Sequence, residues 1–262
     1  MSGLSGFALV LGASSGFGAA TAKALAREGM DVCGVHLDRR ATQPAAEAVA
    51  EAVRGLERKA LFFNVNAADE QKRAAVLDAL ERELAPNPRG GVRVLFHSLA
   101  FGTLAPLVGE NAVTKAQLEM TLDVMAHSLV YWTNDLVRRG LLGEGGRVFA
   151  MTSSGATRTI PQYGPVAAAK AALESHCRQL AFELSPQKIT VNAIRAGVTD
   201  TPSLAKIPGG AKMLEVQLSR HPAGRLTTPE DVAELVALLA RPGARWLSGN
   251  TLGVDGGEDL LP

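Results

Sequence analysis

The sequence is poor in several features that mark common protein classes. Cys33 and Cys177 are its only cysteines, and their spacing suits neither a zinc site nor a disulfide framework. No apolar run reaches the ~18 residues of a membrane-spanning helix, and the N-terminus lacks a basic segment followed by a long apolar core. We therefore expect a cytoplasmic protein that is neither exported nor embedded in a membrane and that binds no metal.

Neither sign of charge dominates the chain. The 27 basic and 26 acidic side chains give a formal net charge of +1. Such a balance generates no field that attracts nucleic acid or an anionic lipid surface, so we expect neither as a partner.

Hydrophobic residues make up 47% of the 262 positions, enough for a sizeable core, and α/β proteins of this length are often one domain. We expect a single domain over residues 1–262.

Strand-like and helical patterns alternate along the chain. Continuous apolar runs predict strands buried on both faces, and helical periodicity predicts the segments between them. Repeated strand-helix units imply an α/β fold with a single Rossmann-like, doubly wound parallel sheet flanked by helices on both faces. The predicted strands are residues 7–11, 31–37, 60–65, 92–98, 147–152, 189–195 and 251–254. The predicted helices follow the first strand to residue 28 and span 45–56, 69–84, 114–139, 164–184 and 228–239, with a Pro/Gly-rich loop at 85–91.

A glycine-rich segment joins the first strand to the first helix. Glycines let the backbone turn sharply and approach a pyrophosphate, and a helix N-terminus offers unpaired N–H groups to it. The spacing differs from G-x-G-x-x-G, so a tight strand-helix turn without a ligand is the alternative. The segment predicts a dinucleotide site formed by Gly12, Ser14, Ser15, Gly16, Phe17 and Gly18.

The end of the second strand bears on the choice of cofactor. His36 stands where an NAD enzyme commonly has a ribose-binding acid, and Leu37 and Asp38 follow it. Arg39 and Arg40 could bind a 2′-phosphate, which favours NADPH over NADH. The alternative is a solvated loop in which Asp38 pairs with an arginine.

Ligands of such sheets bind beyond the carboxyl ends of the strands. We therefore expect cofactor contacts at the ends of the third and fourth strands, with Asn64 reaching an adenine. His97, at the end of the fourth strand, is interpreted as structural rather than catalytic. These expected contacts are Asn64, Val65, Ser98, Leu99 and Ala100.

One tyrosine and one lysine stand out by their spacing. Tyr163 lies just before a helix that begins at Gly164 and Pro165, and Lys170 follows seven residues after Tyr163. Seven residues make nearly two helical turns, so the two side chains share a face. A tyrosine four residues before the lysine would lie on the same face, but ~4.5 Å closer to the lysine along the helix. The spacing therefore sets where the proton donor stands along the substrate.

Residues 196–225 contain no clear buried element. A stretch of this length is uncommon unless it is functional. Residues 203–205 and 213–216 could form short helices that close over a ligand. We interpret 196–225 as a substrate lid.

Taken together, these motifs resemble the short-chain dehydrogenase/reductase family over nearly the whole chain. The glycine-rich segment 12–18, Ser153, the Tyr163 and Lys170 pair, the Gly-x-x-x-Thr segment 197–201 and the closing Val-Asp-Gly-Gly segment 254–257 fall in family order. The resemblance implies that Gly197, Val198, Thr201 and Lys170 also contact the cofactor. It also implies that Lys170 favours the tyrosinate form of Tyr163.

Three departures from the commonest branch are similar to the enoyl-acyl-carrier-protein reductases. Val166 occupies the position four residues before the lysine, where that branch has its tyrosine. Residues 97–100 read His-Ser-Leu-Ala instead of Asn-Asn-Ala-Gly, and Met125 aligns with an asparagine of the usual proton relay. Ser153 is retained, as in the enoyl reductases closest to ketoreductases.

The resemblance implies NAD(P)H-dependent reduction of the trans-2 double bond of an enoyl thioester in fatty acid synthesis. Tyr163, Lys170 and Ser153 are the expected catalytic residues, and Phe101, Tyr163 and Leu204 the expected substrate contacts. A 3-ketoacyl or other carbonyl reductase of the same family is the alternative enzyme. A catalytically silent dinucleotide-binding sensor or scaffold is the alternative of another class.

Expected partners also follow from the resemblance. Family members commonly form homotetramers through the fourth and fifth helices, where Ala168, Ala169, Ala171 and Ala172 would permit close packing. The acyl substrate could be presented by acyl carrier protein, which is acidic. Lys206, Lys212 and Arg220 near the lid could guide that carrier.

Overall fold

The computed structural model describes residues 3–85 and 91–260. Seven strands form one sheet in the order β3-β2-β1-β4-β5-β6-β7, and every adjacent pair is parallel. The strands are β1 (Phe7–Leu11), β2 (Asp31–His36), β3 (Ala60–Asn64), β4 (Val92–His97), β5 (Arg147–Thr152), β6 (Thr190–Ala196) and β7 (Thr251–Val254). The predicted parallel sheet is confirmed, with strand ends within a residue or so of those expected.

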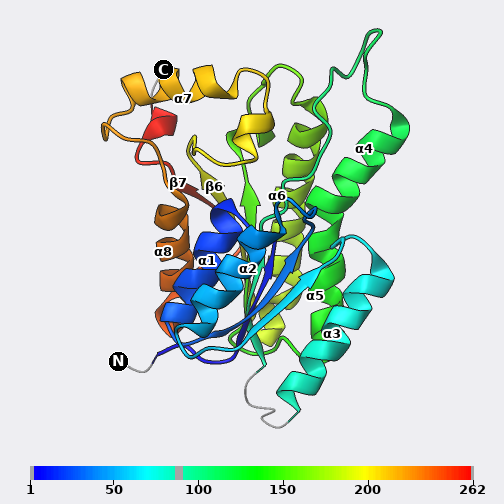
Figure 1. Ribbon diagram of the computed structural model, residues 1–262, viewed down its shortest axis with the longest axis vertical. Coiled ribbons are helices and arrows are strands. Elements are labelled where there is room, and N and C mark those ends of the chain that lie inside the picture. Colours follow the sequence, from blue (N-terminus) through cyan, green and yellow to red (C-terminus); the bar gives the residue numbers. More distant parts are fainter. Residues whose placement is uncertain (1–2, 86–90, 261–262) are drawn as a thin grey trace.

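Helices cover both faces of this sheet (Figure 1). The helices are α1 (Gly16–Arg27), α2 (Gln43–Arg54), α3 (Glu70–Leu84), α4 (Lys115–Leu122), α5 (Ser128–Arg138), α6 (Gly164–Leu184), α7 (Gly210–Arg220) and α8 (Pro229–Ala240). Alternate residues of β1 divide the core into two layers. Phe7, Leu9 and Leu11 pack in the cluster that contains the buried residues of α3, α5 and α6. Ala8 and Val10 pack in the cluster that contains those of α1, α2 and α8, so the sheet is doubly wound.

The strand order reverses direction beside β1. The chain passes outward from β1 to β2 and β3, then returns to β4 on the other side of β1. The carboxyl ends of β1 and β4 are therefore the topological switch point, where open α/β sheets bind ligands. The Gly-rich turn after β1 and the segment after β4 both lie at this edge.

The predicted long helix 114–139 is divided. α4 begins at a Thr114–Gln117 capping box, a π-helical segment spans Asp123–His127, and α5 continues to Arg138. A π-helical segment adds a residue to the helix and is frequent at functional sites. Met125, on this segment, is buried.

The region 196–225 does form helices above the carboxyl ends of the strands (Figure 1). A 3₁₀ turn spans Leu204–Lys206, and α7 is longer than the short helix expected around 213–216. The C-terminal segment lies beside α7 at this end of the molecule (Figure 1). Of the loop predicted at 85–91, residues 86–90 lie outside the described residues.

No helix among residues 3–85 and 91–260 is both long and apolar enough to cross a bilayer.

Candidate active site

The glycine-rich turn between β1 and α1 depends on the absence of side chains. Gly12 has φ +90°, and a Cβ there would collide with the Ser98 carbonyl at the end of β4. A Cβ on Gly18 would collide with the Gly12 carbonyl. The turn is thereby held against both β4 and the first turn of α1.

The N-terminus of α1 fits an anionic ligand. Ser15 is the N-cap in extended conformation, and its side chain makes no capping hydrogen bond. The first-turn N–H groups of α1 have no intrahelical acceptor, and they sit at the positive end of the helix dipole. These residues fit the pyrophosphate of a dinucleotide, as the sequence predicts.

The loop after β2 differs from the alternative given above, a solvated loop in which Asp38 pairs with an arginine. Asp38 pairs with His36, its Oδ2 lying 2.8 Å from His36 Nδ1, and not with an arginine. Asn64 holds the same loop, because its Oδ1 accepts from the Asp38 N–H and its Nδ2 donates to the Asp38 carbonyl, each at 2.9 Å. The Asn64 amide thus uses one acceptor position and one N–H within the protein, and its contact with an adenine stays a prediction.

Tyr163 is brought to Ser153 at the end of β5. The two hydroxyl oxygens lie 3.3 Å apart, and Ser153 Oγ also accepts from the Gly155 N–H at 3.0 Å. Gln162, immediately before Tyr163, has φ +61°, a left-handed conformation that is costly for a residue with a side chain. Tyr163 itself is the N-cap of α6, where the sequence predicts it. The strained turn fixes the direction in which this tyrosine enters the site.

The pKa of Tyr163 moves opposite to the sequence-based expectation. Burial raises the pKa, and the hydrogen bond with Ser153 offsets only part of this rise. Lys170, whose Nζ donates to the Met151 carbonyl, does not shift this pKa. The phenol is therefore a proton donor in this structure and not a tyrosinate.

Lys170 is buried beneath the site. Its Nζ donates to the Met151 carbonyl at 2.7 Å and more weakly to the Leu99 carbonyl at 3.4 Å. Burial lowers its pKa to about 8, although Cys177 and Glu174 act in the opposite direction. An ammonium has three donors, so one remains for a ligand above the strand ends.

The position four residues before Lys170 is apolar and enclosed. Val166 is buried in the cluster that also contains Met125 and Tyr163. A Cβ on Gly102 would lie 2.7 Å from Met125 Sδ and 3.1 Å from Val166 Cγ2, so this part of the site is tightly packed. No proton donor stands at the inner position.

His97 lies below the site in a structural role. Its Nε2 is 2.8 Å from Ser128 Oγ, and Ser128 in turn donates to the Val124 carbonyl. Burial, with the charge of Lys170 as a smaller contribution, lowers its pKa to about 3. A neutral and fully enclosed imidazole supports the structural interpretation.

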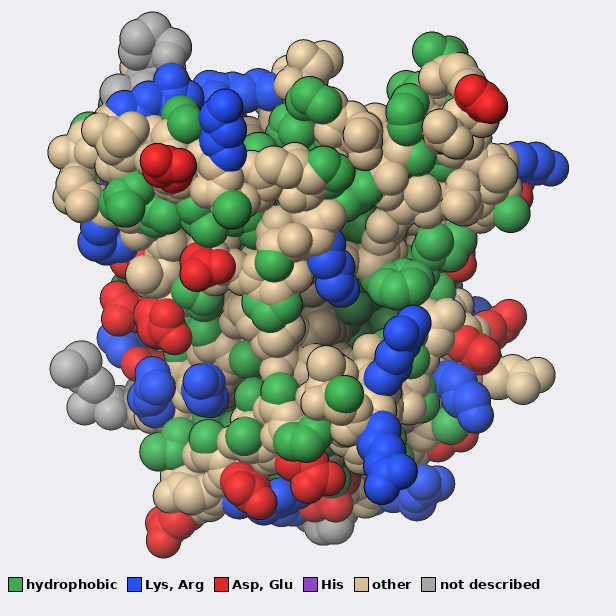
Figure 2. Space-filling view, turned by 45° about the horizontal axis from the view of Figure 1, so that its top comes forward, with side chains coloured by type: hydrophobic (Ala, Val, Ile, Leu, Met, Phe, Trp, Pro, Cys, Tyr) green, Lys and Arg blue, Asp and Glu red, His purple; other side chains and the backbone are tan. Residues whose placement is uncertain are grey.

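The lid segment closes one side of the site. The Thr201 side chain is the nearest neighbour of a Cβ placed on Gly16, and Ile207 packs against the cluster of Tyr163 and Val166. The Val198 N–H, an expected cofactor contact, donates to Glu258 Oε2 at 2.8 Å. Figure 2 shows a hollow near the middle of this face with hydrophobic side chains around it.

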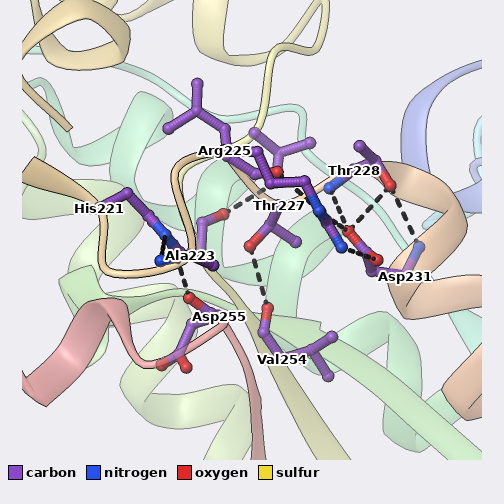
Figure 3. A network of polar contacts seen from close by, with 11 residues as sticks. His221, Ala223, Arg225, Thr227, Thr228, Asp231, Val254 and Asp255 are labelled. Atoms are coloured by element: carbon purple, nitrogen blue, oxygen red, sulfur yellow. Dashed lines mark hydrogen bonds and ion pairs between the residues drawn. The ribbon is translucent and has the colours of Figure 1, made fainter. Parts of the chain in front are cut away.

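Two polar clusters fix the far end of α7 (Figure 3). His221 Nδ1 accepts from the Ala223 N–H at 3.1 Å, so its Nε2 donates to the Asp255 carbonyl at 2.9 Å. Arg225 makes a bidentate pair with Asp231 at 2.7 and 2.8 Å, and Asp231 also completes the capping box that begins α8. The segment after α7 is therefore anchored at both β7 and α8.

The family comparison agrees with this geometry. A family described as enoyl-(acyl carrier protein) reductase matches residues 12–258, which include the glycine-rich turn, Ser153, Tyr163 and Lys170. The chain belongs to the short-chain dehydrogenase/reductase family. It is therefore an oxidoreductase.

Relatives of this short-chain dehydrogenase/reductase have different substrates. The chain is 30% identical to the NADH-dependent enoyl-acyl-carrier-protein reductase FabI of Nostoc over 202 residues, covering 77% of this chain and 76% of FabI. It is 31% identical to the 3-oxoacyl-acyl-carrier-protein reductase FabG of Pseudomonas aeruginosa over 262 residues, covering 95% of each. A short-chain dehydrogenase from Burkholderia cenocepacia in complex with NADP superposes with TM-score 0.82 at 31% identity, covering 96% of this chain and 97% of that one.

The residues of this short-chain dehydrogenase/reductase that were expected to contact a second subunit or the substrate differ in their exposure. Of the four alanines of α6 expected at a subunit contact, Ala168 and Ala171 are exposed, Ala172 is half-buried and Ala169 is buried in the core. Phe101 is 55% exposed at the rim, and Leu204 is partly buried in the lid.

Sequence reasoning missed Leu107. Its side chain is the nearest neighbour of a Cβ placed on Gly164, beside Tyr163, and it remains 59% exposed. The only signal in the sequence is an apolar residue in a loop.

Metal ligation has no support in the part of the chain that the structure describes. Residues 3–85 and 91–260 contain no group of three or more His, Cys, Asp or Glu side chains that could hold an ion. Cys33 and Cys177 are both buried, and burial raises the pKa of each thiol to about 12.

Proposed function

We propose that this short-chain dehydrogenase/reductase reduces the trans-2 double bond of an enoyl thioester with a nicotinamide dinucleotide, as a step of fatty acid synthesis. One observation carries the proposal. The acid of the site, Tyr163, stands at the outer position on α6, while the inner position is filled by the buried Val166.

The position of the acid bears on the reaction because the two reductions develop charge at different places. In ketone reduction, the oxygen to be protonated is bonded to the carbon that receives the hydride. In enoyl thioester reduction, hydride reaches the β-carbon and charge develops on the thioester carbonyl oxygen, further along the substrate. A donor displaced outward along α6 matches the second case.

The chain's own residues would act on the substrate oxygen. The Tyr163 hydroxyl, kept protonated by burial, would donate to the enolate oxygen as charge builds there. Ser153 would orient that hydroxyl, since their oxygens are 3.3 Å apart. Phe101, Leu107 and Leu204 would form apolar walls for the acyl chain and would limit access of water.

A nicotinamide dinucleotide would supply the hydride when bound. The glycine-rich turn and the first turn of α1 would hold its pyrophosphate, and the remaining donor of Lys170 would hold a ribose hydroxyl. NADH and NADP are named with the Nostoc and Burkholderia relatives, respectively. Arg39 and Arg40 would favour NADPH and Asp38 would oppose it.

A carbonyl reductase remains the rival for a specific reason. A Ser153 and Tyr163 pair at 3.3 Å could also hold the oxygen of a ketone, and the Pseudomonas relative is named for 3-oxoacyl reduction. That reaction would require the acid to act from its outer position, because Val166 has no proton to give.

The deciding experiment measures oxidation of NADH and of NADPH with a trans-2-enoyl-CoA and a 3-ketoacyl-CoA of equal chain length. We expect turnover of the enoyl substrate with little turnover of the keto substrate. Turnover of the keto substrate alone would exclude the proposal. Silence on both, with a dinucleotide bound, would favour another carbonyl substrate or the sensor.

We also propose a homotetramer and acyl carrier protein as partners. The exposed small side chains of Ala168 and Ala171 on α6 would permit a second copy to approach closely. Lys206, Lys212 and Arg220 are all exposed and would face an acidic carrier. Figure 2 shows basic side chains gathered at the upper left of the face, the side on which α7 lies in Figure 1.

A further inference from the structure

A carboxylate of α6 meets the end of β5 between the two contacts described above. Thr152 Oγ1 donates to Glu174 Oε1 at 2.8 Å. The residue before Thr152 accepts from Lys170 Nζ through its carbonyl at 2.7 Å. The residue after it is Ser153, whose hydroxyl meets that of Tyr163. Three successive residues at the end of β5 therefore each bind one residue of α6.

The three residues of α6 lie on one face of the helix. Lys170 follows Tyr163 by seven residues and Glu174 follows Lys170 by four, and both spacings return to the same side of an α-helix. Thr152 is buried and Glu174 is half-buried. A hydrogen bond to a charged acceptor is stronger than one between neutral groups. The Glu174 contact therefore helps to fix β5 against this face of α6.

The sheet holds the backbone of Thr152 independently. β5 and β6 pair in parallel as far as Thr152 and Arg195, so Thr152 is fixed to the neighbouring strand. Glu174 adds a polar link from that fixed residue to α6. A shift of α6 along β5 would change the contacts of both Lys170 and Tyr163, and the Glu174 link opposes such a shift. It does so without using an atom of the proposed reaction.

Glu174 also places a negative charge one helical turn from Lys170. Opposite charges at this spacing stabilise each other. Burial lowers the pKa of Lys170 to about 8, and Cys177 and Glu174 act against this fall. The Cys177 thiol, with a pKa of about 12, is neutral at neutral pH, so Glu174 supplies the compensating charge there.

We propose that Glu174 is a positioning residue of this active site, holding the end of β5 in register with α6 through Thr152 and keeping a negative charge beside the Lys170 ammonium. It acts through these two residues rather than on the reacting atoms. This inference rests on the site residues of the proposed function, and it holds for a keto substrate as for an enoyl substrate.

Isosteric variants separate the two effects. Thr152→Val removes the hydrogen bond and leaves the charge. Glu174→Gln removes the charge, while its amide oxygen can still accept from Thr152. Glu183→Gln is the matched control, because Glu183 lies on the same helix, is exposed and accepts from Gln179 within that helix.

The first measurement is the Kd of NADH and of NADPH for the free protein, by cofactor fluorescence, from pH 7 to 9.5. Lys170 would donate to a ribose hydroxyl, so binding should weaken as the amine loses its proton, from about pH 8 in the unaltered protein. In Glu174→Gln the weakening should begin at lower pH, so that Kd at pH 8 rises about threefold or more. Thr152→Val and the Glu183→Gln control should keep the unaltered profile.

Other groups around Lys170 do not produce this profile. His97 on β4 has a pKa of about 3 and Cys177 on α6 one of about 12, both outside the range measured. Burial raises the pKa of Tyr163 above its ordinary value of 10.0. Further groups on neighbouring elements have partners of their own, the pairs being Asp123 with Tyr131, His127 with His176, and Arg195 with Asp259.

The second measurement is kcat at pH 7 with the trans-2-enoyl-CoA and the 3-ketoacyl-CoA named above. Thr152→Val should lower kcat about tenfold, because a donor displaced by a fraction of 1 Å loses part of its effect. Glu174→Gln should stay within about threefold of the unaltered protein, because it keeps the hydrogen bond and Lys170 is still largely protonated at this pH.

Each result bears on one part of the inference. An unchanged pH profile in Glu174→Gln, or no weakening of binding near pH 8 in the unaltered protein, would overturn the role of the charge. A kcat within about twofold of the unaltered value in Thr152→Val would overturn the role of the hydrogen bond. Absence of dinucleotide binding would overturn the proposed function as well, whereas the expected binding profiles without enoyl turnover would overturn only the proposed reaction.

Discussion

The ring of Tyr163 lies against Gly155, so closely that a methyl group on this glycine would collide with it and stand 3.1 Å from Ser153 Oγ. Gly155 follows Ser153 in the turn after β5 and donates its N–H to the serine hydroxyl. The chain beyond β5 therefore fixes the tyrosine from one side, while the strained residue Gln162 fixes it from the other. The acid is held by backbone rather than by a flexible side chain.

Gly155→Ala is expected to displace the Tyr163 hydroxyl. A displacement of about 1 Å can cost ~100-fold in rate, so kcat should fall by this order while the Kd of the dinucleotide stays unchanged. Steady-state kinetics and cofactor titration measure the two quantities. Gly143→Ala is the matched control, because a Cβ at Gly143 meets nothing within 4 Å. Equal kcat in both variants would contradict the inference that Gly155 positions the Tyr163 hydroxyl.

Tyr163→Phe is expected to lower kcat by about 100-fold to 10,000-fold, the usual contribution of a positioned general acid. Dinucleotide binding should be retained, which also separates an enzyme from a silent sensor. The only other tyrosine, Tyr131, donates to Asp123 Oδ1 at 3.1 Å on the α5 side and provides the control Tyr131→Phe. A loss of less than about tenfold in Tyr163→Phe would remove this residue from the chemistry.

Lys170→Met is expected to change how stability depends on pH. The folded pKa of Lys170 is about 8, against an ordinary value of 10.5 that applies to the unfolded chain. Below about 8 the lysine is protonated in both states, and the folded protein bears the full cost of burying the charge. Between about 8 and 10.5 the unfolded chain binds more protons, so this contribution rises with pH.

The measurement is the free energy of unfolding of both proteins in urea from pH 6 to 10.5, without cofactor. We expect Lys170→Met to be the more stable at neutral pH and its advantage to shrink as the pH rises through about 8. A pH-independent difference would mean that Lys170 is not desolvated as strongly as its position implies.

Neutralising Lys206, Lys212 and Arg220 together to Gln tests the proposed carrier site. The three side chains are exposed, so the fold should be unaffected. We expect kcat/KM with an acyl carrier protein substrate to fall about tenfold and to lose most of its salt dependence, while activity with the CoA thioester is retained. Equal loss with both substrates would place these residues at the acyl site instead, and no loss would exclude the carrier surface.

Much of the scaffold could be predicted because its signals are local. Phe7–Leu11 is an uninterrupted apolar run of a strand buried on both faces, and its predicted bounds are those of β1. Pro165 in the first turn and the alanine-rich run after it likewise predicted α6 from Gly164 to Leu184. The bounds of α6 place Tyr163 at its N-cap and Lys170 within it, as the sequence predicted.

The remaining features depend on contacts that no local pattern encodes. Asp38 turns toward the glycine-rich turn because Asn64, on a different strand, holds its backbone. Glu258 reaches the Val198 N–H across a separation of 60 residues. The spacing of apolar residues does not reveal the π-helical segment either. One extra residue changes that spacing by less than the spacing varies along an ordinary helix.

The π-helical segment at Asp123–His127 changes the direction of the α5 side chains around the helix axis relative to those of α4. If the same residues took up ordinary helical winding instead, every later side chain of α5 would turn by about 100° around the axis. Trp132 is fully buried, and its Nε1 donates to the Ala67 carbonyl at 2.8 Å. That turn would carry Trp132 out of the core and would break the hydrogen bond from Arg73 to Asp135. The direction in which α5 presents its side chains therefore depends on the wide winding of this segment.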